Sequence, residues 1–207
     1  MATTADWAKS LGIPAEATLP AVEGYTKRCP RTARQIAVRT LILQGVVCAG
    51  LDINASSIVE WLREQRIWRS VTPDEKALLL NPNRSVKECK RHGRHTEAEW
   101  TLLWAIGKVE VLGLPTCKCD LRQMFEDIVP RFGSDITGFL ATANLRSPGE
   151  LLAEDDRTYN LWCYANGARR RGEALPDDLD LSVLYERRYA FEWLDGMEAW
   201  DDVTCDT

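Results

Sequence analysis

Polar capping residues followed by largely apolar stretches divide the chain into helices, and no convincing run alternates apolar and polar residues as a half-buried strand would. The clearest start signal is Thr72-Pro73-Asp74-Glu75, which combines an N-cap, a proline at the first helical position and a capping-box glutamate. Signals of this kind predict helices over 31–48, from Asn54 through Leu62, over 72–80, 96–112, from Asp120 to before Pro130, over 147–170 and over 181–194.

One of these segments is apolar on nearly every face, which is typical of a helix that other helices surround. It follows a predicted capping box at Thr96 and Glu99 and extends through about Leu112. The pattern therefore predicts an all-α protein, a single irregular bundle of about seven helices around a central tryptophan-rich helix. The expected core anchors are Trp100, Leu103, Trp104, Trp162, Trp193 and Trp200.

The predicted organisation is an N-terminal arm over residues 1–30, loosely attached at its start, and a helical domain over residues 31–207. Exposed loops are expected at 81–95 and 171–180. The 207 residues, 45% of them hydrophobic and 28% charged, suffice for one soluble domain. The longest stretch without a charged residue, Thr40 to Leu51, has only 12 residues, and residues 1–12 lack a signal-peptide pattern. We therefore expect a cytoplasmic protein that does not span a membrane.

The net charge of −5 is unevenly distributed, with a basic excess over residues 1–115 and an acidic excess over residues 116–207. The acidic half disfavours non-specific nucleic-acid binding. The most basic segment, from Arg84 to Arg94, has the charge to bind phosphates, but it has no aromatic residue on which a base could stack. Nucleic-acid binding through residues 84–94 is therefore a second alternative, beside a solvated or internally paired basic segment.

Motifs for common catalytic centres are absent from the sequence, including G-x-S-x-G, the Walker A loop, the dinucleotide fingerprint and H-E-x-x-H. A few cysteines and histidines are of the residue types that bind zinc. However, two of the cysteines form a C-x-C pair, which chelates one tetrahedral ion poorly. We therefore predict no metal and no cofactor, and we interpret these residues as a basic loop with incidental thiols. The residues concerned are Cys89, His92, His95, Cys117 and Cys119.

A set of charged residues lies on otherwise apolar helix faces near the C-terminus. Arg187 shares a stripe with Val183, Ala190 and Leu194, so its side chain should point inward. A buried guanidinium needs a carboxylate partner, for which Asp155, Asp156, Asp201 and Asp202 are the candidates. The set is either a structural ion-pair network that holds the C-terminal segment or a metal or acid/base site. Its members are Asp155, Asp156, Glu186, Arg187, Asp201, Asp202 and Asp206.

The C-terminal residues also carry a family resemblance. The stretch Val183 to Leu194, followed by Trp200-Asp201-Asp202-Val203-Thr204-Cys205-Asp206-Thr207, resembles the ending of the bacterial domain-of-unknown-function family 4272 (DUF4272). The similarity covers roughly residues 31–207 and includes Glu99 to Gly107, Glu60-Trp61-Leu62 and Thr72-Pro73-Asp74-Glu75. This chain departs at Cys205, where a threonine is usual, and at Arg169-Arg170-Arg171. The resemblance implies no established activity.

These observations favour a non-enzymatic module that binds an unidentified protein partner, as a regulatory or immunity-type factor. The polarised charge, the tryptophans and the missing catalytic motifs support this reading. The first alternative is a metal-dependent hydrolase or nuclease that uses the C-terminal carboxylates.

Overall fold

A computed structural model describes residues 4–14, 31–53, 55–175, 179–196 and 198–205 of the chain. The described residues form helices and connecting segments and contain no β-strand, which confirms the all-α prediction. Two single turns of 3-10 helix (Trp68–Ser70, Trp200–Asp202) and one stretch of π-helix (Gln123–Ile128) accompany the α-helices. The α-helices are α1 (Thr4–Ser10), α2 (Ala33–Gly50), α3 (Ala55–Glu64), α4 (Pro73–Leu80), α5 (Val86–Gly93), α6 (Thr96–Ala105), α7 (Thr137–Ala141), α8 (Pro148–Arg171) and α9 (Leu181–Asp195).

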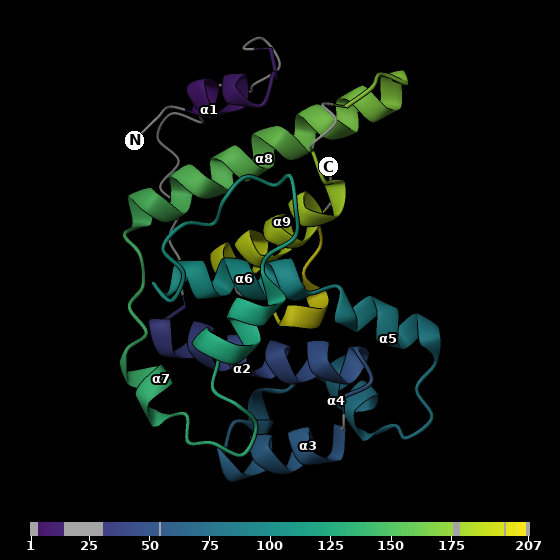
Figure 1. Ribbon diagram of the computed structural model, residues 1–207, viewed down its shortest axis with the longest axis vertical. Helices are drawn as coiled ribbons and strands as arrows, with labels where there is room; N and C mark the ends of the chain where they lie inside the picture. The colour runs from purple at the N-terminus through teal and green to yellow at the C-terminus, as the bar shows by residue number, and fades with distance from the viewer. Residues whose placement is uncertain (1–3, 15–30, 54, 176–178, 197, 206–207) are drawn as a thin grey trace.

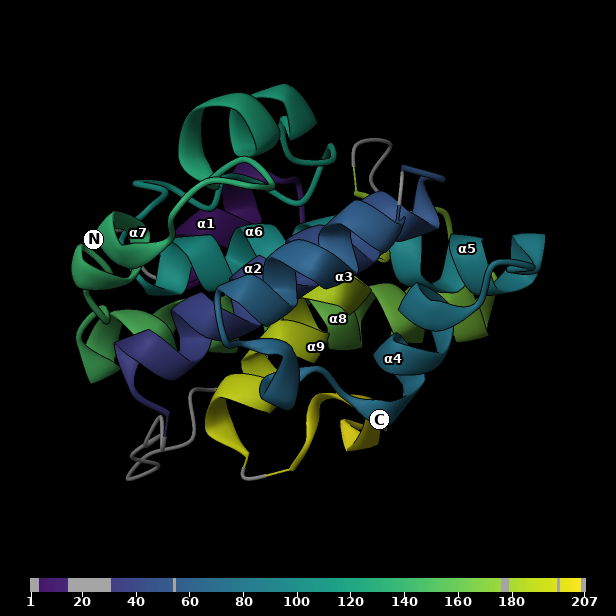
Figure 2. The ribbon, with the colours of Figure 1, turned by 90° about the horizontal axis from the view of Figure 1, so that it is seen from below.

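The helices are stacked in layers around α6 (Figure 1). Helix α6 packs against α2 on one side and α9 on the other, and every one of its residues is buried. Helix α8 covers α9, while α3 and α4 pack on the remaining side of α2, as Figure 2 shows from below. The predicted central helix is therefore confirmed in position.

The central helix is shorter than predicted, because it ends at Ala105 and not near Leu112. Gly107 has a φ of +71°, a left-handed conformation that turns the chain away from the helix axis. The carbonyls of Ala105 and Ile106 then accept hydrogen bonds from the backbone N–H groups of Arg146 (2.9 Å) and Asn144 (3.0 Å). These carbonyls at the end of α6 therefore have hydrogen-bond donors in the segment that leads into α8.

The capping box predicted at Thr72 forms, as does one at Ser147 where a helix start was predicted, but the box predicted at Thr96 does not. Thr72 and Ser147 each accept a hydrogen bond from the backbone three residues on, and the glutamate at that position accepts from the cap residue in return. The box at Thr96 is wrong, because the N-cap of α6 is His95 and it makes no side-chain cap. Glu99, the expected partner, is turned into the interior instead.

The predicted loop over 81–95 is also wrong in its second half, because residues 86–93 form α5. Ser85 and Glu88 make a reciprocal capping box at its start. At its end, the backbones of Gly50 and Gly93 lie so close that a Cβ on Gly50 would be 2.5 Å from the Gly93 nitrogen. Direct backbone packing against α2 thus holds a helix that has little apolar surface of its own.

The burial of the expected core anchors and the packing of the N-terminal arm agree with the sequence predictions in part. Of the six expected anchors, five are buried, and Trp162 on α8 is only partly so. Within the predicted arm, Ala8 and Ile13 are buried against α8 and α9, so this part is packed and not loosely attached. Residues 15–30 lie outside the described part of the chain. No helix of the described residues has both the length and the apolar character required to cross a bilayer.

Candidate functional site

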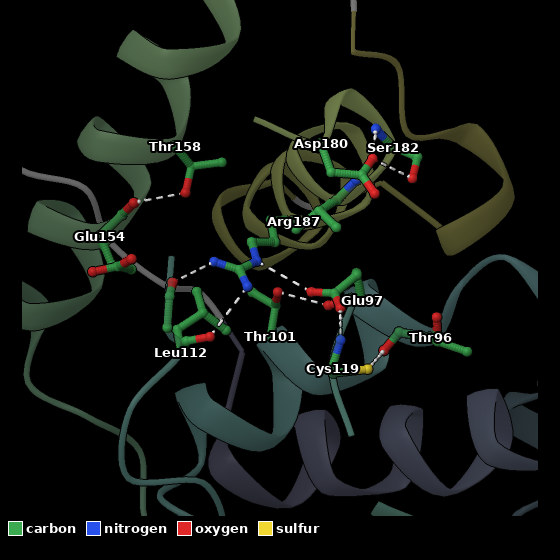
Figure 3. A network of polar contacts seen from close by, with 12 residues as sticks. Thr96, Glu97, Thr101, Leu112, Cys119, Glu154, Thr158, Asp180, Ser182 and Arg187 are labelled. Carbon is green, nitrogen blue, oxygen red and sulfur yellow. Dashed lines mark hydrogen bonds and ion pairs between the residues drawn. The ribbon is translucent and has the colours of Figure 1, made fainter. Parts of the chain in front are cut away.

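Arg187 points inward as predicted, but its partner is Glu97 on α6 (Figure 3). The Nε atom of Arg187 donates to Glu97 Oε2 at 3.2 Å, and the two side chains are 3% and 2% exposed. The guanidinium also donates to the carbonyls of Gly113 (2.7 Å) and Leu112 (3.1 Å). The expectation that Asp155, Asp156, Asp201 or Asp202 would meet Arg187 is therefore wrong, since a glutamate of the central helix occupies that place.

The second carboxylate oxygen of Glu97 is engaged as well. It accepts a hydrogen bond from the backbone N–H of Cys119, and the Glu97 carbonyl accepts from Thr101 Oγ1 at 2.8 Å. Burial, followed by the neighbouring Glu97 carboxylate, raises the pKa of the Cys119 thiol, which therefore stays protonated. This cluster joins α6, α9 and the segment after α6, and every described charge in it has a partner.

Asp201 belongs to a different contact, at the start of α4. Its carboxylate accepts from Thr72 Oγ1 (2.7 Å) and from the backbone N–H of Asp74 (3.0 Å), so it adds to the N-terminal cap of that helix. Trp200 beside it is buried, and its carbonyl accepts a hydrogen bond from the hydroxyl of Tyr189. Residues 200–201 therefore tie α9 to α4.

Glu186 lies in a third contact, at the junction of α5 and α6. One oxygen is 2.8 Å from Nδ1 of His95, and the other is 3.1 Å from Nε of Arg94. The His95 ring lies 5.7 Å from the Tyr189 ring and 6.0 Å from the Trp200 ring, between centroids. His92, the other histidine, is buried, and burial together with Arg91 lowers its pKa to about 4. Both histidines are packed within the protein.

The remaining predicted residues are separated from these contacts. Asp155 and Asp156 are partly buried on α8, Asp202 is exposed, and Asp206 lies outside the described residues. Within the described residues, no group of three or more histidine, cysteine or acidic side chains is arranged so that it could hold a metal ion. The six predicted residues that the structure describes thus do not converge on one site.

A fourth contact, a buried ion pair, was not predicted from the sequence. Arg39 of α2 makes an ion pair with Glu75 of α4, and their side chains are 5% and 1% exposed. Burial alone would raise the pKa of Glu75, but Arg39 and the cap contacts with Thr72 outweigh it and lower the pKa. Glu75 was recognisable as a capping residue, but its partner is 36 positions away in the sequence.

Glu99 is the exception among the buried carboxyl groups. It is fully buried on α6, and neither of its oxygens has a hydrogen-bond partner among the described residues. Burial raises its pKa well above the ordinary value, so the carboxyl group is neutral over a wide pH range. Burial, and then Glu99, raises the pKa of the nearby Cys48 thiol to about 12. Glu99 is enclosed in the core, with no exposed surface of its own.

An open groove with a volume of about 870 Å³ lies between α3 and α4. Its walls include the apolar side chains of Val59, Leu79 and Leu80 and the acidic side chains of Glu60 and Glu64. Leu80 is 54% exposed, so its apolar side chain is open to solvent at the groove. We call this feature the α3–α4 groove.

An ion pair contributes to the lining of the α3–α4 groove. Asp52 and Arg84 both line the groove, and they lie 3.3 Å apart between Oδ1 and Nη2. Leu51 and Ile53, which flank Asp52 in the sequence, and Val86, two positions after Arg84, are exposed but are not among the lining residues.

One comparison with known proteins gives a result. The model of a family described as "Domain of unknown function (DUF4272)" matches residues 1–203, which is nearly the whole chain. The resemblance predicted from residue 31 onward therefore extends to the N-terminal region. Neither the curated proteins nor the solved structures contain a match to this sequence.

Proposed function

We propose that this chain, which belongs to the DUF4272 family, is a non-catalytic module that binds a protein partner, as a regulatory or immunity-type factor. The observation that carries the proposal is the α3–α4 groove, which combines the exposed apolar side chain of Leu80 with the acidic side chains of Glu60 and Glu64. Apolar surface rimmed by polar groups is characteristic of protein-interaction sites.

The arrangement of the buried charges supports the same conclusion. The ion pairs Arg187–Glu97 and Arg39–Glu75 join helices, and none of these four residues lines the α3–α4 groove. A catalytic acid or base has to reach a substrate in a cleft. The hydrolase alternative needs several carboxylates at one place, whereas those of Glu186 and Asp201 are engaged in separate contacts.

Nucleic-acid binding through residues 84–94 receives less support from the contacts of its arginines. Arg84, Arg91 and Arg94 form ion pairs with Asp52, Asp74 and Glu186, respectively. A surface that binds nucleic acid keeps its cations available for phosphates. The basic residues of this segment are instead largely used to attach α5 to the rest of the protein.

Site-specific photo-crosslinking in the native cell tests the proposal. A photoreactive amino acid is placed at Leu80 in the groove, and a matched control is placed at Val111, which is 69% exposed and outside it. We expect a crosslinked protein of defined mass from position 80 and none from position 111. In addition, Glu60→Arg combined with Glu64→Arg should remove that product. Absence of a product from position 80, or the same product from both positions, would contradict the proposal.

A further inference from the structure

A second hollow, with a volume of about 440 Å³, lies where the start of α2 meets the end of α9. Its lining combines three arginines, Arg31, Arg34 and Arg39, with the indole rings of Trp193 and Trp200. We propose that this hollow binds a small organic monoanion, namely a carboxylate attached to an apolar or aromatic body. The proposal does not depend on the α3–α4 groove, with which the hollow shares no lining residue.

Arg31 is held in position before any ligand arrives. Its Nε donates to the carbonyl of Trp193 and its Nη2 to the carbonyl of Glu198, both at 2.7 Å. The guanidinium carbon lies 3.9 Å from the centroid of the Trp193 ring, a cation–π contact. A cation fixed in this way loses little conformational freedom on binding, so its attraction for an anion is not offset by an ordering cost.

The charges around the hollow favour a monoanion over a phosphate dianion. The charge of Arg39 is balanced by Glu75, and Glu198 is the one carboxylate among the lining residues. Arg34 is exposed and makes no ion pair or hydrogen bond with another described residue. Its planar guanidinium can therefore donate two parallel hydrogen bonds to a carboxylate.

The apolar side chains of the hollow form a wall that the apolar body of the ligand can contact. The rings of Trp193 and Trp200 meet edge to face with centroids 5.6 Å apart, and Val38 lies beside them in the lining. Binding pockets for small molecules commonly combine such apolar walls with a few polar groups that orient the ligand, in volumes of about 300–1,000 Å³. A benzoate-sized anion can contact the apolar wall while its carboxylate faces Arg34.

Nuclear magnetic resonance titration of the full chain tests the proposal, with the indole N–H signals of Trp193 and Trp200 assigned through the backbone. The probes are sodium benzoate, benzylammonium and inorganic phosphate. We expect benzoate to shift these two signals in a saturable manner, and the other two probes to leave them unchanged. Arg34→Ala should weaken benzoate binding about tenfold, as expected for loss of a charge-assisted hydrogen bond. Arg170→Ala, which removes an exposed arginine of α8, is the matched control and should not change it.

The proposal would be overturned by equal shifts with benzylammonium, by saturable shifts with phosphate alone, or by unchanged benzoate affinity in Arg34→Ala. The carboxylate has two possible sources, a free acid or the carboxyl end of a peptide. N-acetylphenylalanine separates them, because tighter binding than benzoate assigns the site to peptide ends and equal or weaker binding assigns it to free acids. The amide of N-acetylphenylalanine lacks the charge, and comparable binding of this amide would also contradict the proposal.

Discussion

Glu97 and Glu99 are two positions apart on the same helix, and both are buried, yet their surroundings are opposite. A separation of two residues directs the side chains toward different sides of α6. Glu97 meets Arg187 and the backbone N–H of Cys119, whereas neither oxygen of Glu99 has a partner. A buried glutamate therefore has an ion-pair partner on one face of the central helix and none among the described residues on the other face.

The difference shows what a buried carboxyl group can contribute to this fold. Where a cation and a backbone N–H contact it, the carboxylate joins helices that are distant in sequence. Where no donor is present, the carboxyl group keeps its proton, and its burial costs free energy that packing must offset. We therefore interpret Glu97 as part of the architecture and Glu99 as a local cost to stability.

Removal of the cation that pairs with Glu97 should have the largest effect on stability. Arg187→Met leaves the Glu97 carboxylate and two carbonyls buried without their donor, so we expect a loss of about 3–5 kcal/mol in the free energy of unfolding. Urea denaturation at pH 7 measures this loss, with Arg170→Met as the control for removal of an exposed arginine. The double variant Glu97→Leu with Arg187→Met should recover part of it, because no charge is then left unpaired. A loss below about 0.5 kcal/mol, which is ordinary for surface substitutions, would contradict the role assigned to the pair.

Replacement of Glu99, the carboxyl group without a partner among the described residues, should instead increase stability. Glu99→Met replaces a buried group that has no partner with an apolar side chain, and we expect a gain of about 1–3 kcal/mol at pH 8. Glu97→Met, two positions away, should instead destabilise the protein. Urea denaturation of both variants compares the two faces directly, and equal effects at the two positions would show that the faces do not differ.

The pH dependence sharpens this contrast. The unfolded chain releases the Glu99 proton near the ordinary pKa of 4.5, whereas the folded state retains it to higher pH. Raising the pH above 4.5 therefore favours the unfolded state of the wild-type protein at this group. The stability gained in Glu99→Met should accordingly be larger at pH 8 than at pH 5. A gain that is independent of pH would mean that Glu99 is ionised in the folded state.

Smaller effects are expected where the C-terminal segment meets α4. Asp201→Ala removes two hydrogen bonds from the cap of α4 and should cost about 1 kcal/mol. Asp202→Ala changes an exposed neighbour and should alter stability by less than about 0.5 kcal/mol. The midpoints of thermal unfolding of the two variants provide the comparison. Equal midpoints would contradict the role of Asp201 in joining the C-terminal segment to α4.

Much of the helical architecture could be predicted because it is encoded locally. The capping boxes at Thr72 and Ser147 lie within four consecutive residues, and both form at predicted helix starts. The box at Ser85 and Glu88 has the same spacing, but α5 is rich in basic residues and has little apolar periodicity. Its stability depends on the backbone contact between Gly50 and Gly93, which leaves no local signature in the sequence.

The candidate site could be predicted only in part, for a related reason. Helical spacing correctly predicted that Arg187 points inward, since the residues that share its stripe are apolar. Its partner Glu97 is 90 positions away, and aspartates nearer in sequence were equally suitable chemically. The α3–α4 groove depends on how two helices pack, and exposed Leu80 has the same appearance in the sequence as a core leucine.

The central claim is that the buried charges maintain the fold while the α3–α4 groove binds the partner. One measurement tests it directly: crosslinking from position 80 in variants whose stability has been measured in parallel. Glu60→Arg with Glu64→Arg should abolish the crosslinked product at an unchanged free energy of unfolding. Glu99→Gln, in which the altered side chain is enclosed in the core, should retain the product. Loss of the product in folded Glu99→Gln, together with its retention in the groove variant, would contradict the account.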